Sequence, residues 1–351
     1  MEPPILEKGF TKMGKKRILL LVDGDMVAFS HAAAEEYGKE PEEVNFGKIV
    51  SSMDAKMKFM SDRLQATDTI CLISGDTNMR HTLFPAYKAN RDGVWRPDNL
   101  KNAKAHLIMH WDGLKMDGLE ADDLCAMLSR FKYEMRMGKR GLIKGLEFKG
   151  IRDDYDEVYI ASLDKDLAQI GNSNPTGNGA RILHYRWETQ TSGEKITEVS
   201  GLGSLKVIIK TNAKGEQKKE VKGSGAIFFL WQCLTGDGTD GIIGCGIRET
   251  KIYKSGAKCG QEYQKRNGVG AIAAFELLAN IKSYAEGLGI VQNQYILRFG
   301  DGWAENLLTN GRLLYMANMV DEGNKVRMWH YNPRIVDRFD LGTKQLIEHV
   351  G

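Results

Sequence analysis

The sequence has few cysteines and no long apolar run, and both absences exclude classes of protein. The five cysteines are an odd number and form no C-x-x-C pair, so the sequence predicts neither a disulfide framework nor a zinc site. No apolar run approaches the roughly 20 residues that a membrane-spanning helix requires. The first 17 residues lack the apolar core of a signal peptide and end in basic residues. These features predict a cytoplasmic protein with no membrane partner.

The sequence also has little net charge, only +3, but charges of one sign collect in separate stretches. Residues 80–104, 130–152 and 205–225 are rich in lysine and arginine, whereas acidic residues gather in the short groups DGD, LEADD, SLDKD and TGDGTD. Basic surfaces around an acidic centre suit a polyanion that approaches metal ions. The alternative is that each basic run is a solvated face.

Apolar runs and helical spacing alternate along the first half of the chain. Residues 17–22, 69–74 and 157–162 have the composition of buried strands, and residues 26–37, 45–65, 96–110 and 119–135 have helical spacing. Such alternation predicts an α/β fold with a parallel sheet. The acidic groups fall at strand ends or helix starts, where open α/β sheets bind their ligands.

The pattern changes after the third strand. Residues 182–221 alternate between apolar and polar positions with glycines between the runs, which predicts an inserted hairpin over about residues 180–222. The chain from residue 225 has a helical pattern, residues 268–281 form a glycine-rich turn that leads into a helix, and a further helix is predicted near 306–320. No internal repeat or low-complexity linker separates two independent domains.

The stretch LVDGD, residues 21–25, has three interpretations. Dehalogenase-type phosphohydrolases begin with a similar D-x-D pattern, in which Asp23 would be the nucleophile. Metal-dependent nucleases also have a first strand that ends in a metal-ligating aspartate. In the third interpretation Asp25 caps the next helix and Asp23 lies in a turn.

Nine acidic residues at such positions would repel one another without a cation. Hard oxygen ligands favour Mg²⁺ or Mn²⁺, and two such ions can activate water and stabilise a leaving oxygen in phosphodiester hydrolysis. The nine are Asp23, Asp76, Glu120, Asp122, Asp123, Asp164, Asp166, Asp237 and Asp240.

Basic and aromatic residues lie close together between the second strand and the following helix. Lys88 and Arg91 are three residues apart, which predicts that they share one helical face. Tyr87 and Trp95 are placed to stack on an unpaired base. The alternative is that all four are ordinary surface and core residues.

At this point the sequence resembles a known family. LVDGD, YKANRDG, GLEADDL, SLDKDLAQI, TGDGTDG and GVGAIAA occur in the order seen in 5′-nucleases, a family that includes flap endonucleases, phage 5′–3′ exonucleases and the 5′-nuclease domain of bacterial DNA polymerase I. The resemblance covers roughly residues 18–278 and is closest to the stand-alone phage enzymes. It implies a mixed, mainly parallel central sheet with helices on both faces (the PIN-like 5′-nuclease fold).

The resemblance also implies how the chain is divided. Residues 17–224 would form the nuclease core, with a helical arch at about residues 80–110 and the hairpin insert. Residues 225–290 would contain a helix–three-turn–helix element that binds duplex DNA, and residues 291–351 would be a C-terminal extension.

The same resemblance implies roles for individual residues. All nine acidic residues would serve the metal site, with Asp123 and Asp240 acting through water; Asp23 and Asp164, with Lys88 and Arg91 on the scissile phosphate, would carry catalysis. DNA-binding residues would be Tyr87, Lys88, Arg91, Trp95, Arg96, Lys251, Lys254, Lys258, Gly268, Val269 and Gly270. The cofactors would be two Mg²⁺ ions, replaceable by Mn²⁺, with K⁺ at the glycine turn.

The implied activity is a 5′–3′ exonuclease or 5′ flap endonuclease that acts in phage-type DNA replication or recombination. Its substrate would be duplex DNA with a 5′ end, nick or flap, or an RNA–DNA hybrid, and the protein would be a monomer in the host cytoplasm. A non-catalytic DNA-binding module remains an alternative beside the phosphohydrolase.

The sequence departs from the family pattern at three places. Asp25 stands where the family has serine or threonine, and Ile272 replaces a lysine of the glycine turn. Residues 247–267 form a basic stretch where the family has a short loop. We expect Lys251, Lys254 and Lys258 in this stretch to supply the missing basic contacts.

Overall fold

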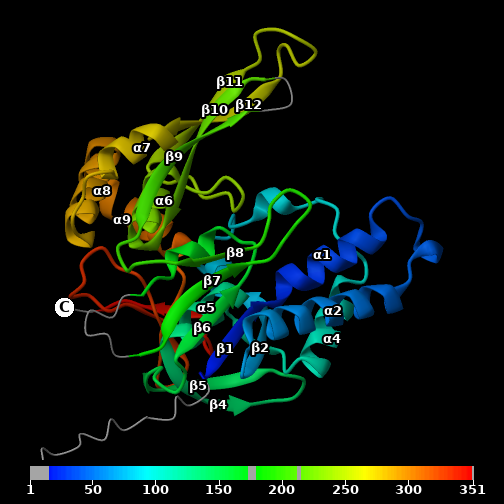
Figure 1. Ribbon diagram of the computed structural model, residues 1–351. Helices are drawn as coiled ribbons and strands as arrows, with labels where there is room; N and C mark the ends of the chain where they lie inside the picture. Colours follow the sequence, from blue (N-terminus) through cyan, green and yellow to red (C-terminus); the bar gives the residue numbers. More distant parts are fainter. Residues whose placement is uncertain (1–15, 173–178, 212–214, 350–351) are drawn as a thin grey trace, which may run out of the picture.

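A six-stranded sheet is the centre of the molecule in a computed structural model, which describes residues 16–172, 179–211 and 215–349 (Figure 1). Its strands lie in the order β3-β2-β1-β6-β7-β8, and all neighbours are parallel except β8, which is antiparallel to β7. The strands are β3 (Leu114–Gly118), β2 (Asp68–Asn78), β1 (Ile18–Asp23), β6 (Glu157–Ala161), β7 (Arg181–Arg186) and β8 (Lys195–Glu198). The predicted mixed, mainly parallel α/β fold is therefore confirmed.

Helices cover both faces of this sheet because β1 is apolar on both sides. Successive side chains of a strand point to opposite faces, so Leu20 and Val22 enter one core while Leu19 and Leu21 enter another. The first core also contains α1 (Gly24–Glu36), α2 (Phe46–Leu64) and α4 (Leu100–His110), and the second contains α5 (Ala121–Arg130).

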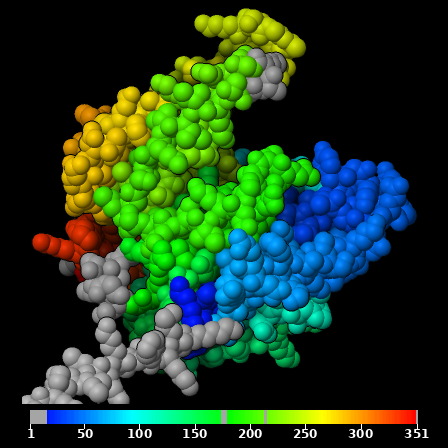
Figure 2. Space-filling model, viewed as in Figure 1, coloured from blue at the N-terminus to red at the C-terminus, as the bar shows by residue number. Residues whose placement is uncertain are grey.

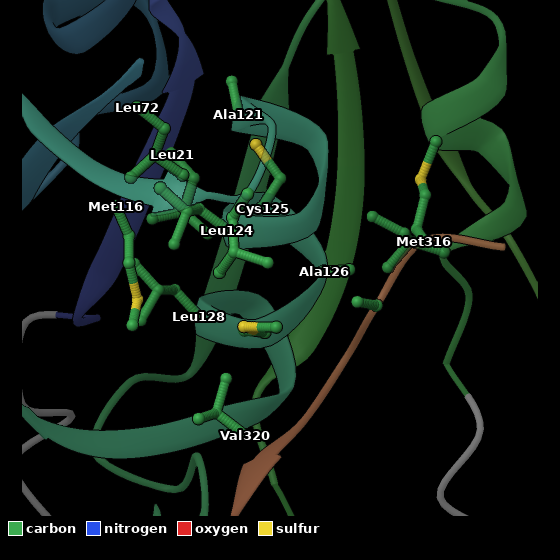
Figure 3. Close-up of a cluster of buried hydrophobic side chains, with 14 of the residues drawn as sticks. Leu21, Leu72, Met116, Ala121, Leu124, Cys125, Ala126, Leu128, Met316 and Val320 are labelled. Atoms are coloured by element: carbon green, nitrogen blue, oxygen red, sulfur yellow. The ribbon is translucent and has the colours of Figure 1, made fainter. Parts of the chain in front are cut away.

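The C-terminal segment packs on the same face of the sheet as α5. Its small antiparallel sheet consists of β13 (Val320–Asp321), β14 (Lys325–Arg327), β15 (Arg338–Asp340) and β16 (Gln345–Ile347). Figure 3 shows Met316 and Val320 of this segment beside the side chains of α5. Side chains of the C-terminal segment therefore complete the core that contains Leu19 and Leu21 of β1.

A third core lies among four helices: α6 (Gly225–Thr235), α7 (Ala271–Leu278), α8 (Tyr284–Phe299) and α9 (Trp303–Leu314). Two hairpins project from this end of the molecule, β9 (Ser204–Thr211) with β10 (Gln217–Ser224), and β11 (Gly246–Ile252) with β12 (Glu262–Gly268). In Figure 2 a hollow separates the projecting hairpins from the blue surface of α1 and α2. Short 3₁₀ turns occur at Pro41–Glu43, Ala89–Arg91, Asp166–Gln169 and Gly300–Gly302.

Several predicted boundaries are wrong. The helix predicted over residues 119–135 ends at Arg130, because Phe131, Tyr133 and Met135 alternate with polar residues and form β4 (Phe131–Met137), which pairs with β5 (Ile143–Ile151). Strands β7 and β8, within residues 181–198, belong to the central sheet. Within the insert predicted over residues 180–222, β9–β10 is therefore the part that forms a separate hairpin. The last predicted helix is α9, which starts and ends earlier, and α8 runs through residue 290.

Residues 80–110 were predicted to form a helical arch, and little of this segment before residue 100 is helical. They contain α3 (Met79–Leu83), a 3₁₀ turn and a loop, followed by α4, which packs on α1.

No helix in the described ranges has the length and apolar character to cross a bilayer.

Candidate active site

A cavity of about 210 Å³ lies at the carboxyl end of the central sheet, where β1 and β6 end and α5 begins. Seven of the nine predicted acidic residues line it, together with the basic pair. They are Asp23, Glu120, Asp122, Asp164, Asp166, Asp237, Asp240, Lys88 and Arg91. Parallel strands thus place acidic residues that are distant in the sequence at one edge, as expected for an open α/β sheet.

Backbone geometry holds Asp23 at the floor of this cavity. It is the last residue of β1 and the N-cap of α1, and its carboxylate accepts hydrogen bonds from the Met26 amide (3.2 Å) and the Ser162 hydroxyl (2.7 Å). Gly24 follows because a Cβ there would lie 2.5 Å from the sulfur of Cys71. The close approach of strand and helix therefore requires the glycine in LVDGD.

Three buried carboxyl groups of the cavity have too little positive charge near them to stabilise their ionised forms. Burial, followed by the charge of Asp25, raises the pKa of Asp23 to about 7. Burial and Asp164 raise the pKa of Asp166 to about 7, and burial with Asp23, Asp164 and Glu120 raises that of Asp122 well above its usual value. A bound cation would relieve this accumulation of negative charge.

Two other carboxylates have cationic partners. Burial alone would raise the pKa of Glu120, but Arg80 and Lys88 outweigh it and lower the value to about 2. Asp237 is also buried, and Lys165, whose ammonium lies 2.9 Å from it, lowers its pKa. The cavity therefore contains both uncompensated and compensated carboxylates.

The chemistry of this donor set fits a hard divalent cation. Its ligating atoms are carboxylate oxygens, which Mg²⁺ and Mn²⁺ prefer, and its unbalanced negative charge is buried. In the described part of the chain, however, no group of three or more histidine, cysteine, aspartate or glutamate residues is arranged to hold a metal ion as it stands. The acids share a cavity without forming a complete coordination shell.

Two predicted metal-site residues lie outside the cavity. Asp76 is 76% exposed and pairs with Lys115, because the end of β2 turns it away, and Ser74 lines the cavity instead. Asp123 is fully buried, and its carboxylate accepts two hydrogen bonds of 2.8 Å from the Arg80 guanidinium. Neither residue lines the cavity, and a metal-site role for them stays a prediction.

Lys88 and Arg91 both line the cavity, but they do not share one face of an α-helix as predicted. Lys88 has a left-handed backbone (φ 58°) and precedes the 3₁₀ turn that contains Arg91. The Lys88 ammonium contacts Glu120, and the Arg91 guanidinium contacts Asp240. Burial raises the pKa of Asp240 even though both cations oppose that shift.

Two predicted DNA-stacking residues have other partners. Tyr87 is only 2% exposed, and its hydroxyl contacts Glu120 (3.0 Å) and Asp240 (3.2 Å), so it is a buried part of the cavity wall. Trp95 is 49% exposed and packs edge-on against Tyr37. Neither Trp95 nor the exposed Arg96 lines the cavity.

The segments predicted to contact duplex DNA, residues 247–267 and 268–270, form a hairpin and a tight turn. Lys251 lies in β11, whereas Lys254 and Lys258 lie in the exposed connection to β12. Gly268 ends β12, and the Val269 amide donates to the Cys245 carbonyl (3.1 Å), so this amide is already engaged. Gly270 is the exposed N-cap of α7.

Sequence reasoning missed several residues of the cavity. Asp25 was recognised as a departure from the family without a role; it lines the cavity, where Lys104 lies 2.9 Å from its carboxylate. Lys165 and Gln232 also line it, and Gln232 donates to Asp166 (2.7 Å). The position of Lys165 within SLDKD was an available signal, whereas no sequence signal indicated the C-terminal wall of Leu313, Leu314 and Met316.

Comparison with known proteins gives the same family as the motifs. A model of the 5′-3′ exonuclease N-terminal resolvase-like domain matches residues 18–198, more than half of the chain. Similar solved structures include bacteriophage T5 D15 protein co-crystallised with metal ions (16% identity, TM-score 0.48) and T5 5′-exonuclease with bound zinc (17%, 0.47). Another is a T5 D15 flap endonuclease complex with DNA and metal ions (16%, 0.47), and each of the three matches covers 85% of this chain and 86% of the other. The resemblance read from the motifs is confirmed by the family match: the chain belongs to the 5′-3′ exonuclease family.

Proposed function

We propose that the protein is a divalent-metal-dependent nuclease that hydrolyses DNA phosphodiesters at or near a 5′ end. The observation that carries this proposal is the shared cavity, in which seven predicted acidic residues face Lys88 and Arg91. A phosphodiester is an anion, so an acidic cavity of this kind suits it only when cations bridge the two.

The metal-site residues of the proposal are those that line the cavity: Asp23, Glu120, Asp122, Asp164, Asp166, Asp237 and Asp240. Mg²⁺, or Mn²⁺ in its place, would supply Lewis acidity for phosphodiester hydrolysis when these residues hold it. The dehalogenase-type alternative gains no support, because Asp23 is 3% exposed and its carboxylate already accepts from Met26 and Ser162.

Lys88 and Arg91 act on the scissile phosphate in this proposal. Each now pairs with a carboxylate of the cavity, so the phosphate oxygens compete with Glu120 and Asp240 for them. Donors placed where charge develops stabilise the transition state more than the bound substrate. Lys88 supplies a compact charge, whereas Arg91 supplies a planar fork that also orients the phosphate.

The proposed substrate is duplex DNA with a 5′ end, nick or flap, and RNA–DNA hybrids are a second substrate. The β11–β12 hairpin and the turn at residues 268–270, with K⁺ at the turn, would hold the duplex. The protein would act as a monomer in phage-type DNA replication or recombination in the host cytoplasm.

A product ladder tests the proposal. Duplexes labelled at the 5′ or 3′ end, with blunt, nicked and flap termini, are incubated with Mg²⁺, Mn²⁺ or EDTA. We expect metal-dependent release of short 5′-terminal products and no release of phosphate from small phosphoesters. Binding without cleavage would support a non-catalytic DNA-binding module, and cleavage of small phosphoesters alone would support a phosphohydrolase.

A further inference from the structure

The outer face of the β9–β10 hairpin carries four exposed lysines. Directly opposed residues of antiparallel strands share a face, and the register pairs Lys206 with Lys222 and Lys210 with Lys218. Between these pairs, Ile208 lies opposite Glu220. Glu220 pairs with Lys210 and Lys222, and Lys206 and Lys218 lie on the same face.

The inner face fixes the hairpin to the protein body. Leu205 packs against the core of α6–α9, and Val221 is 7% exposed. A Cβ at Gly223 would lie 2.3 Å from the Phe228 ring, so the base of the hairpin fits closely against α6. This packing holds the lysine face in a defined position instead of leaving it on a free loop.

The base of the hairpin also adjoins the cavity. Strand β10 continues directly into α6, and it contacts the 3₁₀ turn Asp166–Gln169, whose first residue lines the cavity. From there the hairpin projects away from the sheet, beside the hollow seen in Figure 2. A polyanion with one end in the cavity would pass close to this surface.

The charges on this face disfavour the isolated hairpin. Opposed like charges on neighbouring strands are destabilising, and Glu220 relieves only part of the repulsion. Hydrogen bonds from Lys210 and Lys222 lower the pKa of Glu220 to about 2. An external anion would complete the neutralisation of the face.

We propose that Lys206, Lys210, Lys218 and Lys222 bind the phosphodiester backbone of the substrate duplex, as a contact surface separate from the cavity and from β11–β12. The proposal rests on the nuclease function and extends it along the substrate. Eight residues of strand span about 26 Å, which corresponds to about eight base pairs at 3.4 Å each. The surface should therefore contact duplex several base pairs from the scissile phosphate.

The test compares duplex binding by the wild type and by a variant with all four lysines changed to glutamine. Fluorescence anisotropy is recorded with a labelled 20-base-pair duplex in Ca²⁺, at salt concentrations from low to physiological. Each lost phosphate contact lowers the salt slope by about 0.9, so we expect the slope to fall by about 2 to 4. Affinity should fall about tenfold or more at low salt, where such contacts contribute most.

Two adjacent lysines provide the matched control. Lys218 lies on the lysine face and Lys219 on the opposite face, and both are exposed. Lys218→Gln should weaken binding and reduce the slope, whereas Lys219→Gln should change neither.

Other outcomes would overturn the proposal. An unchanged salt slope in a variant whose thermal unfolding matches the wild type rules out backbone contact by these lysines. Equal effects of Lys218→Gln and Lys219→Gln would show general electrostatic attraction without a defined face. Failure of the wild type to cleave any duplex in Mg²⁺ would instead contradict the nuclease function, and that result is measured separately.

Discussion

At the scale of single residues, position in the cavity separates acids that look equivalent in the sequence. Asp76 and Asp164 both follow stretches predicted as buried strands, yet only Asp164 lines the cavity. The end of β2 continues past Ser74 with a register shift against β3, and this shift carries Asp76 outward to Lys115. A sequence pattern locates the strand end but not such a shift, because one residue of slip reverses the direction of every side chain.

The contrast between these two acids gives a direct prediction. Asp164→Asn should lower the rate of DNA cleavage by orders of magnitude while the protein stays folded, because it removes a charge from the cavity without changing side-chain volume much. Asp76→Asn, a change of the same kind outside the cavity, should keep a rate near that of the wild type. Initial rates in Mg²⁺ and circular dichroism of both variants provide the measurement. A folded Asp164→Asn protein with wild-type turnover would refute the assignment.

Lys88 gives a second prediction at this scale. Lys88→Ala should lower the single-turnover rate on bound DNA by about 100-fold or more, the loss typical for one preorganised donor. Binding in Ca²⁺ should change much less, since the lysine acts mainly in the transition state. Arg91→Ala should weaken both steps because its fork also orients the phosphate. If affinity and rate fell in proportion in Lys88→Ala, the lysine would be a general DNA contact.

At the scale of elements, the strands of the core were predictable and the inserted segments were less so. The strands beginning near residues 18, 69 and 157 are apolar on both faces, and the helices between them follow apolar spacing, so local composition determines them. The segment from 80 to 99 was predicted to be helical, but it is anchored by contacts distant in the sequence. Arg91 and Lys88, for example, meet Asp240 and Glu120. No periodicity encodes such pairs.

The β11–β12 hairpin gives a prediction at the element scale. Changing Lys251, Lys254 and Lys258 to alanine should weaken duplex binding and reduce its salt dependence. Lys251 already pairs with Glu249 (2.8 Å), and the Lys258 ammonium lies 5.9 Å from the centre of the Tyr253 ring, so Lys254 should contribute most among the three. Anisotropy titrations of the triple variant and of Lys254→Ala alone test this order. An unchanged slope would exclude phosphate contact by these lysines.

At the scale of the whole molecule, the C-terminal segment is part of the nuclease body. Arg80 donates to the backbone carbonyls of Leu313 (3.0 Å) and Tyr315 (2.8 Å), and the Ala317 amide donates to Asp123 (2.8 Å). Arg80 and Asp123 are both buried beside the cavity. These contacts cross the division predicted at residue 291. The sequence did not predict these hydrogen bonds, because they involve backbone atoms, whose partners no sequence motif specifies.

This integration predicts that damage to the C-terminal sheet unfolds the whole chain. Phe339 lies in β15, is 1% exposed and packs in the core that contains α5 and one face of β1. Phe339→Ala should lower the free energy of unfolding by about 3–5 kcal/mol, the usual cost of removing a large buried side chain. Because the core is shared, circular dichroism and tryptophan fluorescence should report one coincident transition in urea. Phe339→Leu, which leaves a smaller cavity, should show the same single transition with a smaller loss. An independent extension would instead unfold first in both variants, giving two separated transitions and leaving DNA cleavage intact after the first.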